Sequence, residues 1–369
     1  MLAPDLPALR GIETPALVLD RAALMRNLAA MAESATVNRI ALRPHAKTHK
    51  SAEIARLQVE AGAIGICCAT VAEIEAMAAA GLPGLMLTTP VSDAPKLARL
   101  AAIARGTALA LVVDHPDQVT MLGAHLGGDG PPLQVLVDID VGQRRTGVCA
   151  PPDTVALARA IAATPRVTFA GIQGFAGHVQ HMVDADERKI AAAGVAAALH
   201  AHLAALRAAG FSAEIVTGSG TGACAFDTQG PYTELQVGSY VFMDADYGRL
   251  GRTGGGPLPY EPSLFVLATV TSINRDGEFT VDAGVKALAF NGPPPTLMLG
   301  APEGSTYRFG GDEHGMITMP PGHAAPALGS RILLLTTHCD PTVNLHGRYH
   351  VVDVDGRVTR WPVLGRYGS

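Results

Sequence analysis

Short apolar runs alternate with longer amphipathic stretches over the first two thirds of the chain. The stretches between the runs carry helical periodicity, at 51–61, 71–80, 94–104, 152–163 and 188–209. The runs are rich in branched residues, as strands are, and they fall at 39–44, 63–68, 85–88, 109–113, 133–139, 167–172, 214–217 and 235–240. Eight successive strand–helix units predict a TIM (β/α)8 barrel.

The pattern changes after Gly255. Proline and glycine become frequent, long helical patterns stop, and alternating apolar segments appear at 264–270, 279–282, 331–336 and 349–354. This sequence pattern predicts a second, mostly antiparallel β domain. The segment 15–20 also reads as a strand, but it would be a ninth in the barrel, so we assign it to the β domain. The predicted domains are therefore a barrel at 21–255 and a β-rich domain at 256–369 together with 1–20.

Composition narrows the class of partner. A length of 369 residues suits a barrel plus a smaller domain, and the net charge of -5 comes without long runs of one sign. Neither a nucleic acid nor a membrane is indicated, and the expected partner is a small molecule. Five cysteines without CxxC pairs give no disulfide framework. With no export signal, and no apolar stretch near the about 20 residues of a membrane span, we expect a cytoplasmic protein.

A basic segment, Arg43-Pro-His-Ala-Lys-Thr-His-Lys50, follows the first predicted barrel strand. Barrel enzymes carry their catalytic groups at the carboxyl ends of the strands, which puts Lys47 at the mouth of the barrel. Neighbouring positive charges disfavour the ammonium form of a lysine, so its amine becomes more nucleophilic and suited to a Schiff base. A solvated basic loop has the same composition, so the assignment depends on the motifs that accompany it.

Two glycine-rich turns accompany it, Thr217-Gly-Ser-Gly-Thr-Gly222 after the seventh strand and Gly238-Ser-Tyr240 at the end of the eighth. Glycines let backbone N–H groups approach a phosphate, and the loops after strands 7 and 8 are where barrels commonly bind one. A single such turn is more often only a tight loop. The pair predicts a cofactor that carries a phosphate.

The segment His338-Cys-Asp340 follows an apolar run of the β domain. Residues i and i+2 of an extended chain face the same side, so His338 and Asp340 can bind one metal while Cys339 points away. Imidazole with carboxylate favours Mn²⁺ or Mg²⁺, with Zn²⁺ as an alternative. Two protein ligands leave positions for water and substrate, as in catalytic sites. The alternative is a strand end with two unrelated polar residues.

These motifs together resemble the D-threonine aldolase family over nearly the whole chain. The segments that carry the resemblance are Thr14-Pro-Ala-Leu-Val-Leu-Asp20, Arg43 to Lys50, Gly171-Ile-Gln173, Gln180-His181, Gly218 to Gly222, Glu234-Leu-Gln-Val-Gly-Ser-Tyr240, Phe242-Met-Asp244, Asp312-Glu-His-Gly315 and His338-Cys-Asp-Pro-Thr342. Relatives of that family are 3-hydroxy-D-aspartate aldolases and D-serine dehydratases. The resemblance implies the alanine-racemase-like fold (fold type III), pyridoxal 5'-phosphate (PLP), a divalent metal, a D-amino acid substrate and a homodimer.

Carried over to this sequence, the resemblance makes Lys47 the lysine that holds PLP and makes His338 and Asp340 the metal ligands. Arg145 matches the arginine that approaches the phenolic oxygen of the cofactor, although Arg144 adjoins it. The residues that it assigns to cofactor binding in the two glycine-rich loops are Ser219, Gly220, Thr221, Gly238, Ser239 and Tyr240.

Two positions depart from the related enzymes. The resemblance also assigns Gln236 to cofactor binding, but alanine racemases place an arginine at this position, against the pyridine nitrogen, so their mechanism does not transfer unchanged. Phe175 stands where relatives often carry a tyrosine, which removes a hydroxyl from the loop after the sixth strand. His314, from the β domain, is a further candidate for lining the pocket.

The family places a catalytic base at His181, and an imidazole pKa of about 6.5 suits proton transfer at neutral pH. His178 and a metal-bound water are alternatives. The implied reaction is cleavage of a D-β-hydroxy amino acid to glycine and an aldehyde by a carbon–carbon lyase. A D-serine or 3-hydroxy-D-aspartate dehydratase is the alternative, although dehydratases typically carry a cysteine where this chain has Asp340. A non-catalytic PLP-binding protein is a third, which the β domain argues against.

Overall fold

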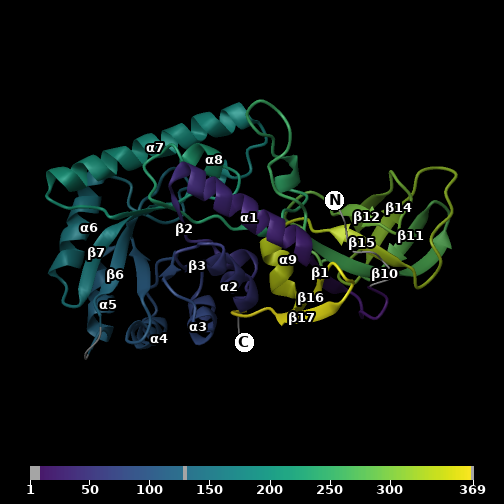
Figure 1. The fold of residues 1–369 in the computed structure, drawn as a ribbon, viewed down its shortest axis with the longest axis horizontal. Coiled ribbons are helices and arrows are strands. Elements are labelled where there is room, and N and C mark those ends of the chain that lie inside the picture. Colours follow the sequence, from purple (N-terminus) through teal and green to yellow (C-terminus); the bar gives the residue numbers. More distant parts are fainter. Residues whose placement is uncertain (1–8, 128–130, 367–369) are drawn as a thin grey trace.

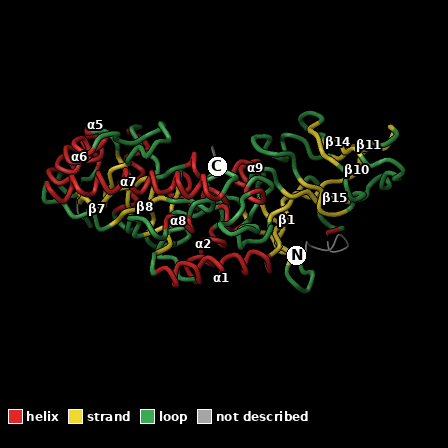
Figure 2. The backbone as a smooth tube through the Cα atoms, turned by 90° about the horizontal axis from the view of Figure 1, so that it is seen from above, coloured by secondary structure: helices red, strands yellow, loops and turns green. Residues whose placement is uncertain are grey.

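The structure is a computed structural model that describes residues 9–127 and 131–366. The molecule is elongated, with a parallel sheet wrapped by helices at one end and a mixed, mostly antiparallel sheet at the other (Figure 1). Helix α1 (Arg21–Asn38) runs along one flank between the two parts (Figure 2). The predicted combination of a (β/α) barrel with mostly antiparallel β-structure is confirmed.

Eight parallel strands form the first sheet, in the order β2-β9-β8-β7-β6-β5-β4-β3. Their bounds are β2 Ala41–Leu42, β3 Ile66–Cys68, β4 Leu85–Leu87, β5 Leu109–Val113, β6 Leu133–Asp138, β7 Val167–Gly174, β8 Ile215–Gly218 and β9 Glu234–Leu235. The sheet closes beside β2 and β3, where the N–H groups of Ile64 and Cys67 donate to the carbonyls of Leu42 and Pro44, each over 2.8 Å. Most strand residues are buried, as unbroken apolar runs predict.

The last barrel strand is shorter than predicted. β9 ends at Leu235, and the expected continuation to residue 240 is a turn with a 3₁₀ helix at Ser239–Val241. The N–H of Tyr240 donates to Thr221 Oγ1 over 2.9 Å instead of to a neighbouring strand. The apolar run 235–240 resembles a strand because its side chains are buried, although they are buried in a loop.

Helices cover the outside of the barrel. Ser51, Thr70, Asp93 and Asp184 each cap a helix by accepting a backbone N–H from its first turn. The bounds of the helices are α2 Ala52–Glu60, α3 Val71–Ala79, α4 Ala94–Ala104, α5 Pro116–His125, α6 Pro151–Ala163, α7 Ala185–Ala208 and α8 Cys224–Asp227.

Helix α7 corrects one expectation from the sequence. By length and composition alone it is apolar enough to cross a membrane, whereas no such segment was predicted. The apolar character comes largely from alanine, and the helix packs against α6 and α8 in the outer layer of the barrel. Its buried residues Ala192, Val195 and Leu199 recur on one face, as in a helix that covers a sheet. We therefore interpret α7 as a barrel helix.

Within the described residues, the second sheet has nine strands. β1 pairs with β10 antiparallel and with β16 parallel, so the predicted placement of the N-terminal strand in this sheet is confirmed. Strands β12, β13, β14 and β17 were not predicted, because exposed and half-buried residues dilute their alternation. The bounds are β1 Ala16–Asp20, β10 Leu264–Arg275, β11 Glu278–Val281, β12 Thr296–Leu299, β13 Thr306–Phe309, β14 Gly315–Thr318, β15 Arg331–Leu335, β16 Arg348–Val352 and β17 Val358–Pro362.

The mixed sheet is packed on both faces. Leu17, Val266 and Leu334 belong to the large core that extends through the barrel helices, whereas Val18 and Phe265 pack with a smaller cluster on the opposite face. Helix α9 (Cys339–Leu345) follows β15 and packs against the 3₁₀ turn Ala46–Thr48 after β2. This contact brings the end of the mixed sheet to the mouth of the barrel.

Candidate active site

A cavity of about 250 Å³ opens at the carboxyl ends of the barrel strands. Of the residues predicted from the sequence, Lys47, Arg145 and Gln236 line it. Arg145 lies over the ring of Phe175, 5.9 Å from its centroid. The lining residues are His45, Lys47, Ala69, Thr88, Thr89, Arg145, Thr146, Gln173, Phe175 and Gln236. Their position at this end of the barrel is where such folds carry chemistry.

Lys47 projects from the turn after β2. His45 caps the turn, because its Nδ1 accepts the backbone N–H of Lys47 over 3.3 Å. The Lys47 side chain is 39% exposed, and its Nζ forms an ion pair with Oδ2 of Asp340. The amine is therefore reachable from solvent and lies against a carboxylate from the other part of the molecule.

Among the residues that the structure describes, the expected cluster of unpaired positive charges around Lys47 is not found. Arg43 forms an ion pair with Glu234 over 2.8 Å, and Lys50 forms one with Glu73. Both side chains are buried with their carboxylates, because an isolated buried charge would lose its hydration. The charged neighbour in contact with Lys47 is instead Asp340.

His45 forms a neutral part of the cavity wall. Since its Nδ1 accepts a hydrogen bond, the proton lies on Nε2, which is 3.0 Å from Thr88 Oγ1. Burial, followed by the charge of Lys47, holds the pKa of His45 well below its usual value. The imidazole therefore contributes a fixed hydrogen bond without a charge.

The predicted metal pair has a different local structure from the one expected. His338 is extended, but Asp340 lies in the first turn of α9, so the two do not alternate along a strand. The backbone N–H of Cys339 donates to Asp244 Oδ2 over 2.8 Å, and its side chain is buried. Pro341 is the signal for this helix start, because the first helical turn tolerates a residue without an N–H.

Asp340 and His338 nevertheless fit a cation. Asp340 Oδ1 is buried and has no hydrogen-bond partner, which is costly for a carboxylate oxygen unless something else binds it. Burial raises the pKa of Asp340, but Lys47 and His338 outweigh it and bring the pKa far below its usual value. His338 Nδ1 lies 3.0 Å from the Asn291 amide, which leaves Nε2 for a cation. Within residues 9–127 and 131–366, no cluster of three or more His, Cys, Asp or Glu forms a metal site, so water or substrate would complete the coordination.

His181 lies beside this pair. Its ring centroid is 6.1 Å from that of His338, and its Nδ1 is 2.6 Å from Asp246 Oδ2. His178 instead faces Gly142, so of the two candidate bases His181 is the one that adjoins His338. Asp246 was missed in the sequence, although it stands two residues after the recognised Asp244. A carboxylate on Nδ1 orients the ring and leaves Nε2 to act as base.

The two glycine-rich loops form a cradle that fits an anion. Within the described chain, the backbone N–H groups of Gly220, Thr221 and Gly238 have no acceptor in the protein. Thr48 Oγ1 is also buried without a partner, and it stands 2.6 Å from where a Cβ on Gly238 would lie. Ser219 has a φ of 69°, which turns its loop sharply after β8. Any side chain at 238 would fill the space that a phosphate needs.

The side chains of two predicted cofactor-binding residues, Tyr240 and Ser219, bond within the protein instead of facing the cradle. The Tyr240 hydroxyl accepts a hydrogen bond from Gln58 over 3.1 Å, and its ring packs on Tyr260. Only its backbone belongs to the cradle. The Ser219 hydroxyl donates to the backbone carbonyl of Gly220 over 3.5 Å. Burial raises the pKa of the nearby Asp227 to about 6, and Ser219 partly offsets this rise. His314 is exposed between β13 and β14 and does not line the cavity.

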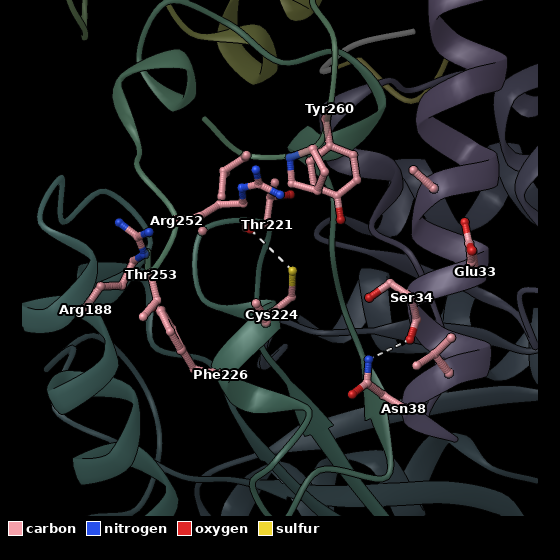
Figure 3. A pocket seen from close by; sticks show the side chains of 16 residues that line it. Glu33, Ser34, Asn38, Arg188, Thr221, Cys224, Phe226, Arg252, Thr253 and Tyr260 are labelled. Carbon is pink, nitrogen blue, oxygen red and sulfur yellow. Dashed lines mark hydrogen bonds between the residues drawn. The ribbon is translucent and has the colours of Figure 1, made fainter. Parts of the chain in front are cut away.

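A second cavity, of about 630 Å³, lies behind the cradle, between α1, α8 and the segment 252–260 (Figure 3). Phe226 and Tyr260 supply apolar walls. Buried Arg188 reaches it, with its guanidinium bonded to the backbone carbonyls of Met182 and Gly251. Arg188 thereby connects Gly251, which directly precedes the segment 252–260, to the loop after β7. None of the predicted catalytic or metal-binding side chains is among the described residues that line this cavity.

Comparison with known proteins covers both parts of the chain. The model of the alanine racemase N-terminal domain matches residues 19–246, and that of a putative serine dehydratase domain matches residues 263–352. The chain is 41% identical to D-threonine aldolase from Arthrobacter sp over 360 residues, which are 97% of this chain and 94% of the relative.

Solved structures are similar over the same extent. The crystal structure of D-threonine aldolase from Filomicrobium marinum has a TM-score of 0.92 at 39% identity, over 97% of this chain and 96% of the other. D-threo-3-hydroxyaspartate dehydratase from Delftia sp. HT23 has a TM-score of 0.84 at 27% identity, over 96% and 98%. A D-threo-3-hydroxyaspartate dehydratase has also been solved in a metal-free form.

Proposed function

The chain belongs to the D-threonine aldolase family of carbon–carbon lyases, and from this membership we propose that it cleaves D-β-hydroxy amino acids of the D-threonine type to glycine and an aldehyde. PLP and a divalent cation are the proposed cofactors. One observation carries the proposal: the Lys47 amine, at the mouth of the barrel, is in contact with Asp340 of the candidate metal pair. The covalent cofactor and the cation would therefore act on the same substrate atoms.

The residues of the cavity fit PLP. Lys47 would hold its aldehyde carbon, and the cradle of Ser219, Gly220, Thr221, Gly238 and Ser239 would hold its phosphate. The unpartnered N–H groups of the cradle and Thr48 Oγ1 support this placement. When bound, PLP supplies the electron sink for the pair released as the Cα–Cβ bond breaks.

His338 and Asp340 would hold the divalent cation, for which the unpartnered Asp340 Oδ1 is the support. An imidazole and a carboxylate suit Mn²⁺ or Mg²⁺, with Zn²⁺ as an alternative. A cation there would supply Lewis-acid stabilisation of a developing β-alkoxide. A related dehydratase solved in a metal-free form is consistent with metal use in these enzymes.

The protein itself supplies orientation and proton transfer. His181 Nε2 would take the proton of the β-hydroxyl, because Asp246 holds Nδ1 and orients the ring toward His338. Arg145 faces the cavity and balances negative charge there, whereas Arg144 is not among the residues that line it. The homodimer and the cytoplasmic location stay predictions.

The product from D-threonine tests the proposal. Purified protein with PLP and Mn²⁺ should convert D-threonine, and not L-threonine, to equimolar glycine and acetaldehyde, measured by amino-acid analysis and an aldehyde assay. Cleavage of Cα–Cβ conserves the amino group in glycine. Release of ammonia and a 2-oxo acid as the main products would show loss of the hydroxyl instead and would replace the aldolase with a dehydratase.

A further inference from the structure

Three buried side chains form a hydrogen-bonded chain along one wall of the cavity. Gln236 Nε2 donates to Gln173 Oε1 over 3.0 Å, and Gln173 Nε2 donates to Asp138 Oδ1 over 2.8 Å. All three residues are less than 5% exposed, and both glutamines line the cavity. In such a buried chain, a group that can only accept hydrogen bonds decides which end of each amide faces which neighbour.

Two fixed acceptors set the orientation of Gln173. Its Nε2 faces Asp138 and also donates to the backbone carbonyl of Thr88 over 3.0 Å. A carboxylate and a backbone carbonyl can only accept, so the amide nitrogen of Gln173 must face them. Burial raises the pKa of Asp138 to about 6, which leaves the carboxylate mostly ionised at pH 7.5, where it accepts the hydroxyl of Thr146 over 2.7 Å. The amide oxygen of Gln173 is therefore the atom presented to Gln236.

The same reasoning fixes the orientation of the Gln236 amide group. Its Nε2 donates to Gln173 Oε1 and to Thr217 Oγ1, each over 3.0 Å, which uses both amide hydrogens. Its backbone N–H donates to Gly218 over 2.7 Å, so the residue is held at both ends. In the part of the chain that the structure describes, no donor reaches Gln236 Oε1, and this oxygen is not among the enclosed unpartnered atoms. It is therefore the acceptor left open to the cavity.

We propose that Asp138, acting through Gln173, fixes Gln236 so that its amide oxygen accepts a hydrogen bond from the ring nitrogen of PLP, which is thereby held in its protonated form. The inference rests on the proposed function, because it takes PLP to occupy this cavity. An unprotonated ring nitrogen has only a lone pair and cannot donate to an amide oxygen. An arginine at position 236 would donate and favour the unprotonated ring. Gln236 is thus a cofactor-binding residue, and Asp138 and Gln173 are positioning residues.

The chemical consequence suits carbon–carbon cleavage. A protonated pyridine ring withdraws electrons more strongly, so it stabilises the electron pair left on Cα better than a neutral ring does. The cations that line the same cavity, Arg145 and Lys47, oppose protonation of the ring. Asp138 provides a nearby negative charge that compensates for these cations. Two further charges act on the pKa of Asp138 itself: Asp114 raises it and Arg145 lowers it. The Gln236 amide oxygen therefore favours protonation of the ring nitrogen in a cavity whose cations oppose it.

The test reads the ring nitrogen directly, by NMR of the holoenzyme loaded with PLP labelled with ¹⁵N in the ring. At pH 7.5 the wild-type signal should match a protonated pyridine standard. Gln236→Leu, which removes the acceptor, should shift it to the neutral standard, whereas Gln236→Glu should keep it protonated. Asp138→Asn is isosteric but can donate to Gln173, so it should shift the signal toward neutral. Thr146→Ser is the matched control, because it keeps the hydroxyl that donates to Asp138 and should leave the signal unchanged.

The outcomes separate this inference from the proposed function. A neutral ring nitrogen in the wild-type holoenzyme overturns the inference, and so does a signal that Gln236→Leu and Asp138→Asn both leave protonated. In either case the cofactor would still be bound to Lys47. Failure of labelled PLP to form a sodium borohydride-reducible bond to Lys47 would instead defeat the proposed function. Circular dichroism of each variant confirms that the comparison is made between folded proteins.

Discussion

At the scale of single residues, the sequence located Lys47 but not its surroundings. Its place after the first barrel strand follows from local pattern alone. The pairing of Arg43 with Glu234 does not, because the partners are 191 positions apart and either could have paired elsewhere. The pairings decide the chemistry, since they neutralise the basic neighbours and leave Asp340 against the amine. Residue type and position thus predict Lys47 as a candidate nucleophile, and only tertiary structure shows its electrostatic setting.

The first prediction concerns Lys47 itself. Lys47→Ala should lose the visible absorbance band of the lysine-bound cofactor and at least about 10³-fold in activity, because the amine that would attach the cofactor is removed. Absorbance spectroscopy of the purified protein measures the first effect. Lys286→Ala is the control, since that lysine is exposed in a turn after β11 and pairs with Glu313, far from the cavity lining. A band of unchanged intensity in Lys47→Ala would assign the cofactor to another amine.

A second prediction uses the pKa of Asp227, which burial raises from 3.8 to about 6. The folded protein therefore holds a proton between pH 4 and pH 6 that the unfolded chain has lost. This contribution to stability is present below pH 4 and is lost as the pH rises through 6. Asp227→Asn does not titrate, so its free energy of unfolding relative to wild type should rise by about 1–2 kcal/mol between pH 5 and pH 8.

Urea unfolding of the cofactor-free protein at the two pH values measures this difference, without a bound phosphate that titrates in the same range. Asp276→Asn, in an exposed turn, is the control and should change stability equally at both values. A relative stability of Asp227→Asn that falls as the pH rises would contradict the assignment, because it would mean that the buried carboxylate stabilises the fold.

At the scale of elements, periodicity predicted what is locally encoded. The barrel strands and their helices, and β1 in the mixed sheet, were found because branched apolar runs and amphipathic stretches differ in period. The segment 235–240 was read as strand because burial in a loop gives the same apolar run. The pair His338 and Asp340 was placed on a strand because alternation was assumed across a helix start. Both errors fall where the chain leaves regular structure to build the site.

A third prediction concerns the bulge in β7. Gly171 has a φ of +148°, and a Cβ there would overlap the carbonyl of Ile215 in the neighbouring β8. The register of β7 against β6 shifts at this point. Gly171→Ala should therefore force the strands apart and lower the free energy of unfolding by at least about 3 kcal/mol. It should also displace Gln173, which lies two residues later in the same strand.

Gly194→Ala is the matched control for chemical denaturation. Gly194 is exposed within α7 and has open space around its Cβ position. Alanine there should raise the free energy of unfolding by about 0.5–1 kcal/mol, through helix propensity alone. Equal effects of the two substitutions would show that the close approach between β7 and β8 is not a constraint.

At the scale of the whole molecule, the site exists because two parts meet. The sequence indicated a barrel and a β domain, each from its own pattern of apolar and polar residues. It did not indicate how the two pack together. Helix α9 lies on the turn after β2, and so Lys47 contacts Asp340 although 293 positions separate them. Asp246, which follows the barrel, in turn holds His181 beside His338. A local sequence pattern carries no information about a contact of this kind, so the sequence gives candidate residues for the site but not their arrangement.

The last prediction distinguishes the effect of removing the metal from the effect of removing the cofactor. The candidate cofactor ligands lie in the barrel, whereas His338 and Asp340 follow β15 of the mixed sheet, so chelation should abolish turnover of D-threonine and leave the absorbance band of bound PLP. Mn²⁺ or Mg²⁺ should restore activity. Asp340→Cys should raise the Mn²⁺ concentration for half-maximal activation by about 10-fold or more, because a thiolate binds this hard cation less well than a carboxylate and favours Zn²⁺. Full activity of the stripped enzyme, or unchanged Mn²⁺ activation of Asp340→Cys, would mean that the pair is structural and that Asp340 serves only the amine of Lys47.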